Sequence, residues 1–231
     1  MLDYYHLKQW EYPLELTVET EKVFANNLMK SKSVIDLGCG AGGATNFFAC
    51  KYPDLKFLGL DNDCELIRYA NSKNERENCS FDFFDIYTSP LENHEEAISG
   101  LISLATLSWL RDFKYPIKRL VNAFKPEWIG ITSLFYDGNI SSYATIYEHS
   151  TSRVMSYNTY SLTQIRSYLN SLGYDLTQCI PFDIQFDLQR SENRNMMGTY
   201  TVRIDSESIS RIQISGPQLM SWYILLAERI H

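Results

Sequence analysis

A glycine cluster after a short apolar segment is the part of the sequence best suited to hold a ligand. The segment 33–37 runs into Gly38-Cys-Gly-Ala-Gly-Gly43, and Asp36 stands directly before the cluster. Glycines let the backbone turn sharply and approach a ligand closely, and a helix that begins there presents unpaired N–H groups. Asp61 ends the next apolar segment and can accept hydrogen bonds from ribose hydroxyls. These residues predict a nucleoside site at the carboxyl edge of a parallel sheet.

Two classes of cofactor fit these residues. Gly38, Gly40 and Gly43 match the G-x-G-x-x-G spacing of dinucleotide sites, which is a weak signal alone. A dinucleotide places its pyrophosphate at the helix N-terminus, where a carboxylate such as Asp36 adds nothing useful. A carboxylate suits a ligand that has cationic groups and no phosphate. S-adenosylmethionine, with its ammonium and sulfonium, is such a ligand.

The elements around the glycine cluster alternate between short strands and helices. We expect strands at 33–37, 56–60, 80–84, 98–104 and 128–135, and helices at 15–29, 45–51, 65–72 and 114–124. After a loop or cap at 137–158, we expect a helix at 162–172, strands at 180–188, 199–204 and 211–215, and a helix at 218–230. This order predicts an α/β, Rossmann-like fold with a doubly wound, mainly parallel sheet. We also expect an antiparallel late edge strand and an added hairpin, formed by 199–204 and 211–215.

The segment from Ser33 to Phe135 resembles the class I S-adenosylmethionine-dependent methyltransferases. In that family the Asp-Leu-Gly-Cys-Gly loop, here 36–40, wraps the amino-acid part of the cofactor. Gly59-Leu-Asp61 resembles the block with the ribose-binding acid, and Phe84-Asp85-Ile86 resembles the block beside the adenine. Residues 102–110 are similar to the block under the methionine portion. Phe124-Lys-Pro126 resembles a further family turn, although Glu127-Trp128 replaces its glycines.

The resemblance implies S-adenosyl-L-methionine as cofactor, S-adenosyl-L-homocysteine as product, and a set of residues that hold them. The methionine end falls to Asp36, Gly38, Cys39, Gly40 and Gly42, the ribose to Asp61, the adenine to Asn62, Asp85 and Ile86, and the pocket floor to Ser103, Leu104, Ala105 and Trp109. Trp109 fits a place in the core equally well.

Motifs that the sequence lacks exclude some classes of methyl acceptor. Enzymes that methylate base nitrogens carry an Asn/Asp-Pro-Pro-Tyr/Phe motif where this chain has Ser103-Leu-Ala-Thr. The Pro-Cys pair of pyrimidine C5 enzymes does not occur either, and we assign no metal site. Net charge is −7 and the pI is about 5.1, which disfavours nucleic acid as a partner. We therefore expect a small polar metabolite, methylated at oxygen, and the 197–201 and 213–223 segments hint at a sugar-like or natural-product acceptor.

Acceptor-side residues are expected in two segments that would cover the carboxyl edge of the sheet. Histidine has an unperturbed pKa near 6.5 and suits general-base work. The candidates for catalysis are His6, His149 and Tyr136, and those for substrate binding are Tyr5, Gln9, Trp10, Asp137, Tyr157 and Asn158. Each of these residues fits a surface or purely structural position equally well.

The 231 residues fit a single methyltransferase domain, with 1–30 as an N-terminal cap region and 136–160 as a substrate-side insert. Five cysteines without a CxxC pair, no evident signal peptide and no long apolar run indicate a cytoplasmic protein outside the membrane. A monomer or a homodimer fits equally. Two other function classes stay open: an NAD(P)-dependent oxidoreductase, and a non-catalytic cofactor-binding partner protein.

Overall fold

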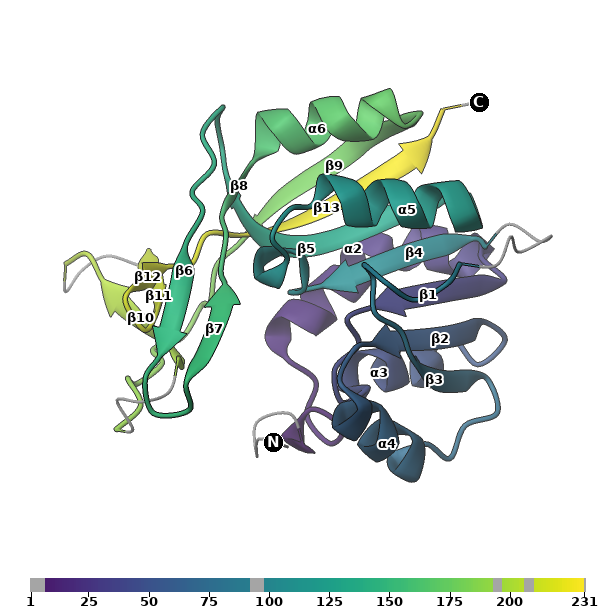
Figure 1. Ribbon diagram of the computed structural model, residues 1–231, viewed down its shortest axis with the longest axis horizontal. Coiled ribbons are helices and arrows are strands. Elements are labelled where there is room, and N and C mark those ends of the chain that lie inside the picture. The colour runs from purple at the N-terminus through teal and green to yellow at the C-terminus, as the bar shows by residue number, and fades with distance from the viewer. Residues whose placement is uncertain (1–6, 92–97, 193–196, 206–209, 231) are drawn as a thin grey trace.

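The computed structural model describes residues 7–91, 98–192, 197–205 and 210–230 (Figure 1). Their main sheet has the strand order β3-β2-β1-β4-β5-β13-β9, and a short strand, β8, also pairs with β5. The strands are β1 Ser33–Leu37, β2 Lys56–Asp61, β3 Cys79–Phe83, β4 Gly100–Leu104, β5 Trp128–Tyr136, β8 Tyr160–Ser161, β9 Tyr174–Phe182 and β13 Trp222–Arg229. Strands β1 to β5 pair in parallel, so their carboxyl ends meet at one edge.

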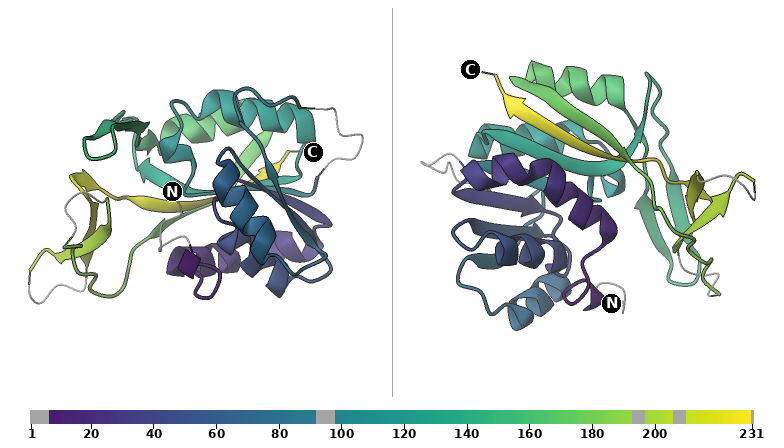
Figure 2. Two further views of the ribbon diagram at one scale, coloured as in Figure 1. Left: turned by 60° about the horizontal axis from the view of Figure 1, so that its bottom comes forward. Right: turned by 180° about the vertical axis from the view of Figure 1, so that it is seen from behind.

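Helices cover both faces of the sheet (Figure 2). They are α2 Glu15–Lys30, α3 Gly43–Lys51, α4 Cys64–Lys73, α5 Lys114–Phe124 and α6 Leu162–Ser171, with a 3₁₀ turn, η1, at Leu107–Trp109. Apolar side chains of α5 and α6 join one buried core, and those of α2, α3 and α4 join another on the opposite face. The doubly wound, mainly parallel fold expected from the sequence is therefore confirmed.

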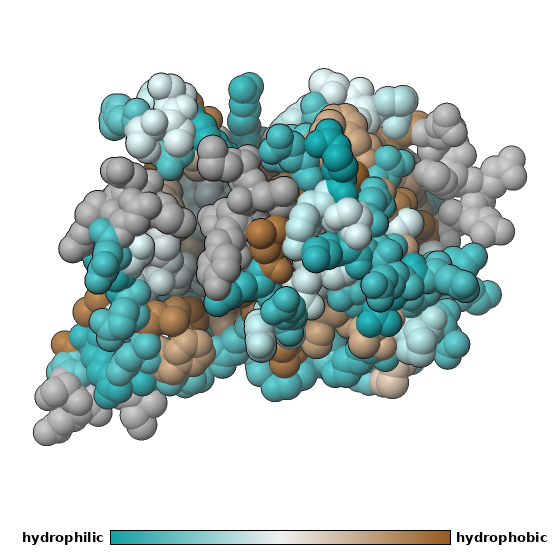
Figure 3. All heavy atoms as spheres, turned by 90° about the horizontal axis from the view of Figure 1, so that it is seen from below, coloured by the Kyte–Doolittle hydropathy of each residue, from teal (hydrophilic) through white to brown (hydrophobic). Residues whose placement is uncertain are grey.

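Two small antiparallel sheets are added beyond the carboxyl edge of the main sheet. The hairpin of β6 Thr145–Glu148 and β7 Arg153–Ser156 lies inside the segment expected to be a loop or cap. The outer sheet consists of β10 Thr199–Arg203, β11 Arg211–Ser215 and β12 Gln218–Leu219. Its β10–β11 pair confirms the added hairpin. Apolar side chains gather on part of the surface (Figure 3), and Val202 and Leu219 of this outer sheet are exposed.

The helix expected at 218–230 is wrong, because this segment forms β12 and β13. Strand β13 is antiparallel to both of its neighbours and lies between β5 and the edge strand β9. Its residues Ile224 to Ala227 are all buried, as expected of a central strand that is covered on both faces. A short apolar run without alternation does not distinguish such a strand from a buried helix. The expected antiparallel edge strand is β9, which ends the sheet and is antiparallel to β13.

The strand expected at 180–188 begins earlier, since β9 covers Tyr174–Phe182. Burial alternates at the start of β9, where Tyr174 and Leu176 face the core. Pro181 lies near its end and is tolerated there because β9 is an edge strand. Gly173, at φ +85°, follows α6 and ends it as expected.

Candidate functional site

The glycine loop connects β1 to α3 and turns through three left-handed glycines. Gly38, Gly40 and Gly42 have φ values of +75°, +56° and +86°, a region that favours glycine. A Cβ at Gly38 would overlap the side chain of Thr106, and one at Gly42 would lie 2.7 Å from the ring of Phe81. Apart from its chain neighbours, no described residue has an atom within 4 Å of a Cβ position at Gly40. The loop is therefore packed at its two ends and open in the middle.

Asp36 lies under this loop at the end of β1 and is 1% exposed. Its Oδ2 accepts a hydrogen bond of 2.6 Å from the Thr45 hydroxyl in the first turn of α3. Its Oδ1 is buried and has no hydrogen-bond partner in the part of the chain that the structure describes. Burial raises the pKa of this carboxyl to about 7, the Thr45 hydrogen bond opposes the rise, and the charge of Asp61 adds to it. Asp36 is thus a costly buried acid with one acceptor atom free.

Asp61, at the end of β2, braces the loop from the neighbouring strand. Its Oδ2 accepts a 2.8 Å hydrogen bond from the Gly40 N–H, and its Oδ1 accepts one of 2.9 Å from the Asp63 N–H. Burial raises the pKa of Asp61, and these backbone hydrogen bonds counteract the rise. Asp63 in turn caps α4 by accepting from the Glu65 and Leu66 N–H groups. The structure thus places Asp36, the loop and Asp61 together.

The residues expected beside the adenine lie just beyond β2 and β3. Asn62 is exposed, whereas Ile86 is buried. The Asp85 carboxylate accepts from the Tyr87 N–H and the Thr88 hydroxyl, both at 2.8 Å. Those hydrogen bonds, the Tyr87 N–H first, lower its pKa. The Asp85 carboxylate therefore stabilises the turn in which it lies, and Ile86 contributes an apolar side chain at the same edge of the sheet.

The segment after β4 lies across from the loop. Ser103 is buried and donates to the Leu37 carbonyl at 3.2 Å, which ties β4 to β1. Leu104 is half-buried, and Ala105 adopts a left-handed φ of +58°. Trp109 is 42% exposed, and its ring lies 4.3 Å from that of Tyr157, centroid to centroid.

The N-terminal segment reaches the loop from the other side. The Trp10 indole N–H donates to the Ala41 carbonyl, and its ring packs at 6.1 Å from Phe81. A Cβ at Gly43 would lie 2.7 Å from Cβ of Gln9, so Gln9 covers the start of α3. The two other candidates of this segment, Tyr5 and His6, fall outside the described residues.

The candidates of the insert separate into two groups. Tyr157 and Asn158 are buried. Asn158 donates to the Leu110 carbonyl at 2.8 Å and to the Tyr160 hydroxyl, and accepts from the Ala144 N–H. These contacts make Asn158 an anchor of the insert. Tyr136, Asp137 and His149 are exposed, and His149 lies in the turn between β6 and β7.

Thr45, Thr106 and Cys39 have structural roles at the site that the sequence did not predict. Thr45 and Thr106 hold Asp36 and Gly38, the latter through a 3.2 Å hydrogen bond from the Thr106 hydroxyl to the Gly38 carbonyl. A hydroxyl three residues into the helix after a strand-ending acid is the signal that could have identified Thr45. Cys39 is buried, and burial raises its pKa well above the usual thiol value, so it packs beneath the loop.

The family model of the "Methyltransferase domain" matches residues 28–178, which run from the end of α2 into β9 and include β1, the glycine loop, α3 and β2. The chain belongs to this methyltransferase family. Its fold and loop are those of a class I S-adenosylmethionine-dependent methyltransferase, so the protein is an enzyme that uses S-adenosyl-L-methionine and releases S-adenosyl-L-homocysteine. The oxidoreductase and the non-catalytic alternatives are thereby set aside.

Relatives and solved structures agree with this assignment. The methyltransferase is 25% identical over 206 residues to a malonyl-[acyl-carrier protein] O-methyltransferase of Acetivibrio thermocellus, covering 84% of this chain and 71% of that one. It is 29% identical over 127 residues to a trans-aconitate 2-methyltransferase of Variovorax paradoxus, covering 54% and 48%. Its fold matches the magnesium protoporphyrin IX methyltransferase of Synechocystis PCC 6803 with a TM-score of 0.56 and 13% identity, over 99% and 89% of the chains.

The loop site suits the cofactor's chemistry. The free Oδ1 of Asp36 is a buried negative acceptor, which a cation would satisfy. The open space at Gly40 leaves room for a ligand to lie against the backbone.

No described helix has the length and apolar character needed to cross a bilayer.

Proposed function

We propose that this methyltransferase transfers the methyl group to an oxygen of a small polar metabolite that carries a carboxylate. The observation that carries the proposal is that both relatives named above act on acids, malonyl-[acyl-carrier protein] and trans-aconitate. A carboxylate oxygen is already anionic near neutral pH, so its methylation needs no general base. This agrees with the place of His149, the only histidine in the part of the chain that the structure describes, in an exposed hairpin turn.

Different residues of the chain would bind different parts of the cofactor, which supplies an electrophilic methyl group on its sulfonium. We propose that Asp36 provides negative charge for the ammonium end, while Gly38, Gly40 and Gly42 shape the backbone around it. Asp61 would bind the ribose. The adenine would lie among Asn62, Asp85 and Ile86, and the floor would consist of Ser103, Leu104, Ala105 and Trp109.

On the acceptor side, we propose that Trp109 and Tyr157 form one wall and Gln9 and Trp10 form the opposite one. The supporting contacts are the close Trp109–Tyr157 ring pair and the packing of Gln9 and Trp10 on the glycine loop. Residues 1–231 would then act as one domain, with 1–30 and 136–160 as covers of a site that excludes water.

The first experiment is calorimetry of the purified protein against S-adenosylhomocysteine, with NADH as control. Labelled methyl donor is then tested with a panel of mono- and dicarboxylic acids, sugars, phenols and amines. A methyl ester releases volatile methanol on treatment with base, whereas a methyl ether or methylamine does not. We expect base-labile product from acids, and none with the Asp61→Ala variant. Transfer to sugars alone would overturn the carboxylate proposal.

A further inference from the structure

A groove separate from the cofactor site lies between α2 and the carboxyl end of β9. Its volume is about 310 Å³. It is lined by Glu15, Glu19, Val23, Ile180, Pro181, Phe182, Asp183, Gln185 and Ile224. In the strand order, β4 and β5 separate β13 and β9 from β1, which carries the glycine loop. With strands about 4.8 Å apart, the groove lies on the order of 15 Å or more from that loop.

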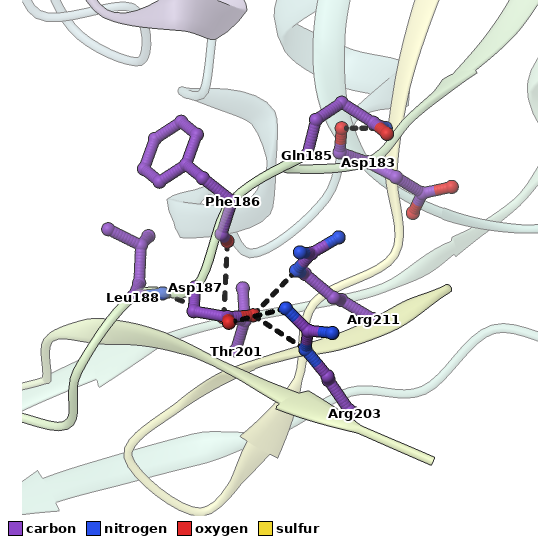
Figure 4. Close-up of polar contacts among 8 residues, drawn as sticks. All are labelled: Asp183, Gln185, Phe186, Asp187, Leu188, Thr201, Arg203 and Arg211. Carbon is purple, nitrogen blue, oxygen red and sulfur yellow. Dashed lines mark hydrogen bonds and ion pairs between the residues drawn. The ribbon is translucent and has the colours of Figure 1, made fainter. Parts of the chain in front are cut away.

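The rim of the groove carries more negative charge than the described residues neutralise. Glu19 pairs with Lys22 at 2.6 Å. The Asp183 carboxylate accepts a 3.2 Å hydrogen bond from the Gln213 amide, and it points away from the Asp187–Arg203–Arg211 ion-pair cluster (Figure 4). Among the described residues, no lysine or arginine forms an ion pair with Asp183.

Glu15 is the sharper observation. Its Oε2 is shielded from water and has no hydrogen-bond partner among the described residues, and Glu15 stands in the first turn of α2, where no side chain caps the helix. A buried acceptor without a donor costs free energy. A ligand that brings an N–H would recover it once the Glu15 side chain turns this oxygen into the groove. The positive end of α2 opposes a cation, but the carboxylates of Glu15 and Asp183 outweigh its half charge.

The floor of the groove is apolar. Val23 and Ile224 come from α2 and β13, and Phe182, 7% exposed, comes from the end of β9. Ile180, on the same strand, is 38% exposed and offers free apolar surface. A charge that lies against such a floor is screened less than in water, which strengthens its attraction to the carboxylates.

We infer that this groove binds an organic cation, namely an ammonium group on an apolar stem. The ammonium would donate to Glu15 and lie near Asp183, and the stem would cover Ile180 and Phe182. Such a cation has two possible sources, the distal end of a long methyl acceptor or a separate small molecule. Both share this chemistry, and the site does not depend on the carboxylate proposal.

Calorimetry with butylamine and hexylamine at 0.15 M salt tests the site. We expect hexylamine to bind more tightly, by about fourfold for each added methylene, and hexanoate not to bind. Glu15→Gln should weaken hexylamine binding at least tenfold. Glu77→Gln removes the same charge from an exposed position after α4 and should leave binding unchanged. Ile180→Ser should remove the difference between butylamine and hexylamine.

Equal affinity of hexylamine for the wild type and the Glu15→Gln variant would overturn the site, and so would tight binding of hexanoate or no binding of hexylamine. The binding measurement needs no methyl transfer, so failure of the carboxylate proposal would leave it intact. Labelled methyl donor separates the two sources. If a bound amine competes with the methyl acceptor and slows transfer to it, the groove holds the acceptor's distal end. If it binds and leaves transfer unchanged, the groove serves a separate ligand.

Discussion

At the residue scale, the Asp36 carboxyl links cofactor binding to stability. Burial raises its pKa from 3.8 to about 7 in the folded chain, so between these values the folded state binds more protons than the unfolded state. Stability therefore falls as pH rises through this window. The penalty is absent below pH 4 and complete above pH 7, where it reaches about 4 kcal/mol.

Asp36→Asn should remove this penalty, because an amide does not ionise. Urea unfolding should show the variant more stable than the wild type at pH 8, with a smaller difference at pH 5. The variant should also bind S-adenosylhomocysteine at least tenfold more weakly, since the charge for the ammonium is lost. Asp54→Asn, at an exposed position, is the control. A stability difference that does not change with pH would contradict the role of Asp36.

Substitutions at two glycines of the same loop should distinguish an effect on folding from an effect on cofactor binding. Gly40→Ala places a methyl group in open space, so it should cost only the left-handed strain of about 1–2 kcal/mol. Gly42→Ala adds an overlap with the Phe81 ring and Ala70, worth about 1–3 kcal/mol more. Both should lose cofactor affinity in calorimetry, but only Gly42→Ala should show a large fall in urea midpoint. Unchanged affinity in Gly40→Ala would remove the loop's centre from the site.

At the element scale, the end of the insert is attached to η1. Asn158 bonds to Leu110 through its side chain and to the Ser108 carbonyl through its N–H, and the Tyr160 hydroxyl also donates to Leu110. The Ser108 hydroxyl meets that of Ser133 at 2.6 Å, which ties η1 to β5. The wall that contains Trp109 and Tyr157 is therefore built as one unit.

Asn158→Ala should loosen this unit. It removes the hydrogen bonds of the buried Asn158 side chain, including the acceptor for the half-buried Ala144 N–H, and should cost about 1–3 kcal/mol in urea unfolding. Trypsin should then cleave faster after Arg153, on β7, while cofactor affinity changes little. Asn122→Ala, at an exposed position on α5, serves as the comparison. Cleavage at the wild-type rate would show that the insert is held by other contacts.

The elements that the sequence predicts well are amphipathic helices and short apolar runs that end at turn residues. The helices α2, α5 and α6 are of the first kind and the parallel strands up to β5 of the second, and their predicted limits are close to those observed. In β13, Leu225 and Ala227 belong to one core while Ile224 and Leu226 belong to the other, so the strand shows no alternation. The segment 218–230 is also as long as a helix, and length is what distinguishes a buried strand from a buried helix when periodicity does not.

The site divides in the same way. The cofactor edge follows from local order, since acids end neighbouring parallel strands and therefore meet. The acceptor side depends on how distant segments fold back. The burial of Asn158 and the exposure of His149 follow from the β6–β7 hairpin, and no local pattern announces it.

At the scale of the whole molecule, the main sheet is completed only by the end of the chain. β13 enters between β5 and β9 and pairs with both, so neither neighbour replaces it. Its buried side chains fill the cores on both faces of the sheet. A chain that ends at residue 221 would expose the unpaired backbone edges of β5 and β9 and leave cavities in both cores.

We therefore expect residues 1–221 to lack a cooperative urea transition and to bind no S-adenosylhomocysteine, although every residue proposed for the cofactor is present. Added peptide 222–231 should restore both, because it supplies hydrogen bonds to β5 and β9 together with the missing core. A scrambled peptide of the same composition is the control. If 1–221 unfolds cooperatively and binds the cofactor alone, the family-matched segment 28–178 stands without β13, and the late strand serves the outer sheet instead.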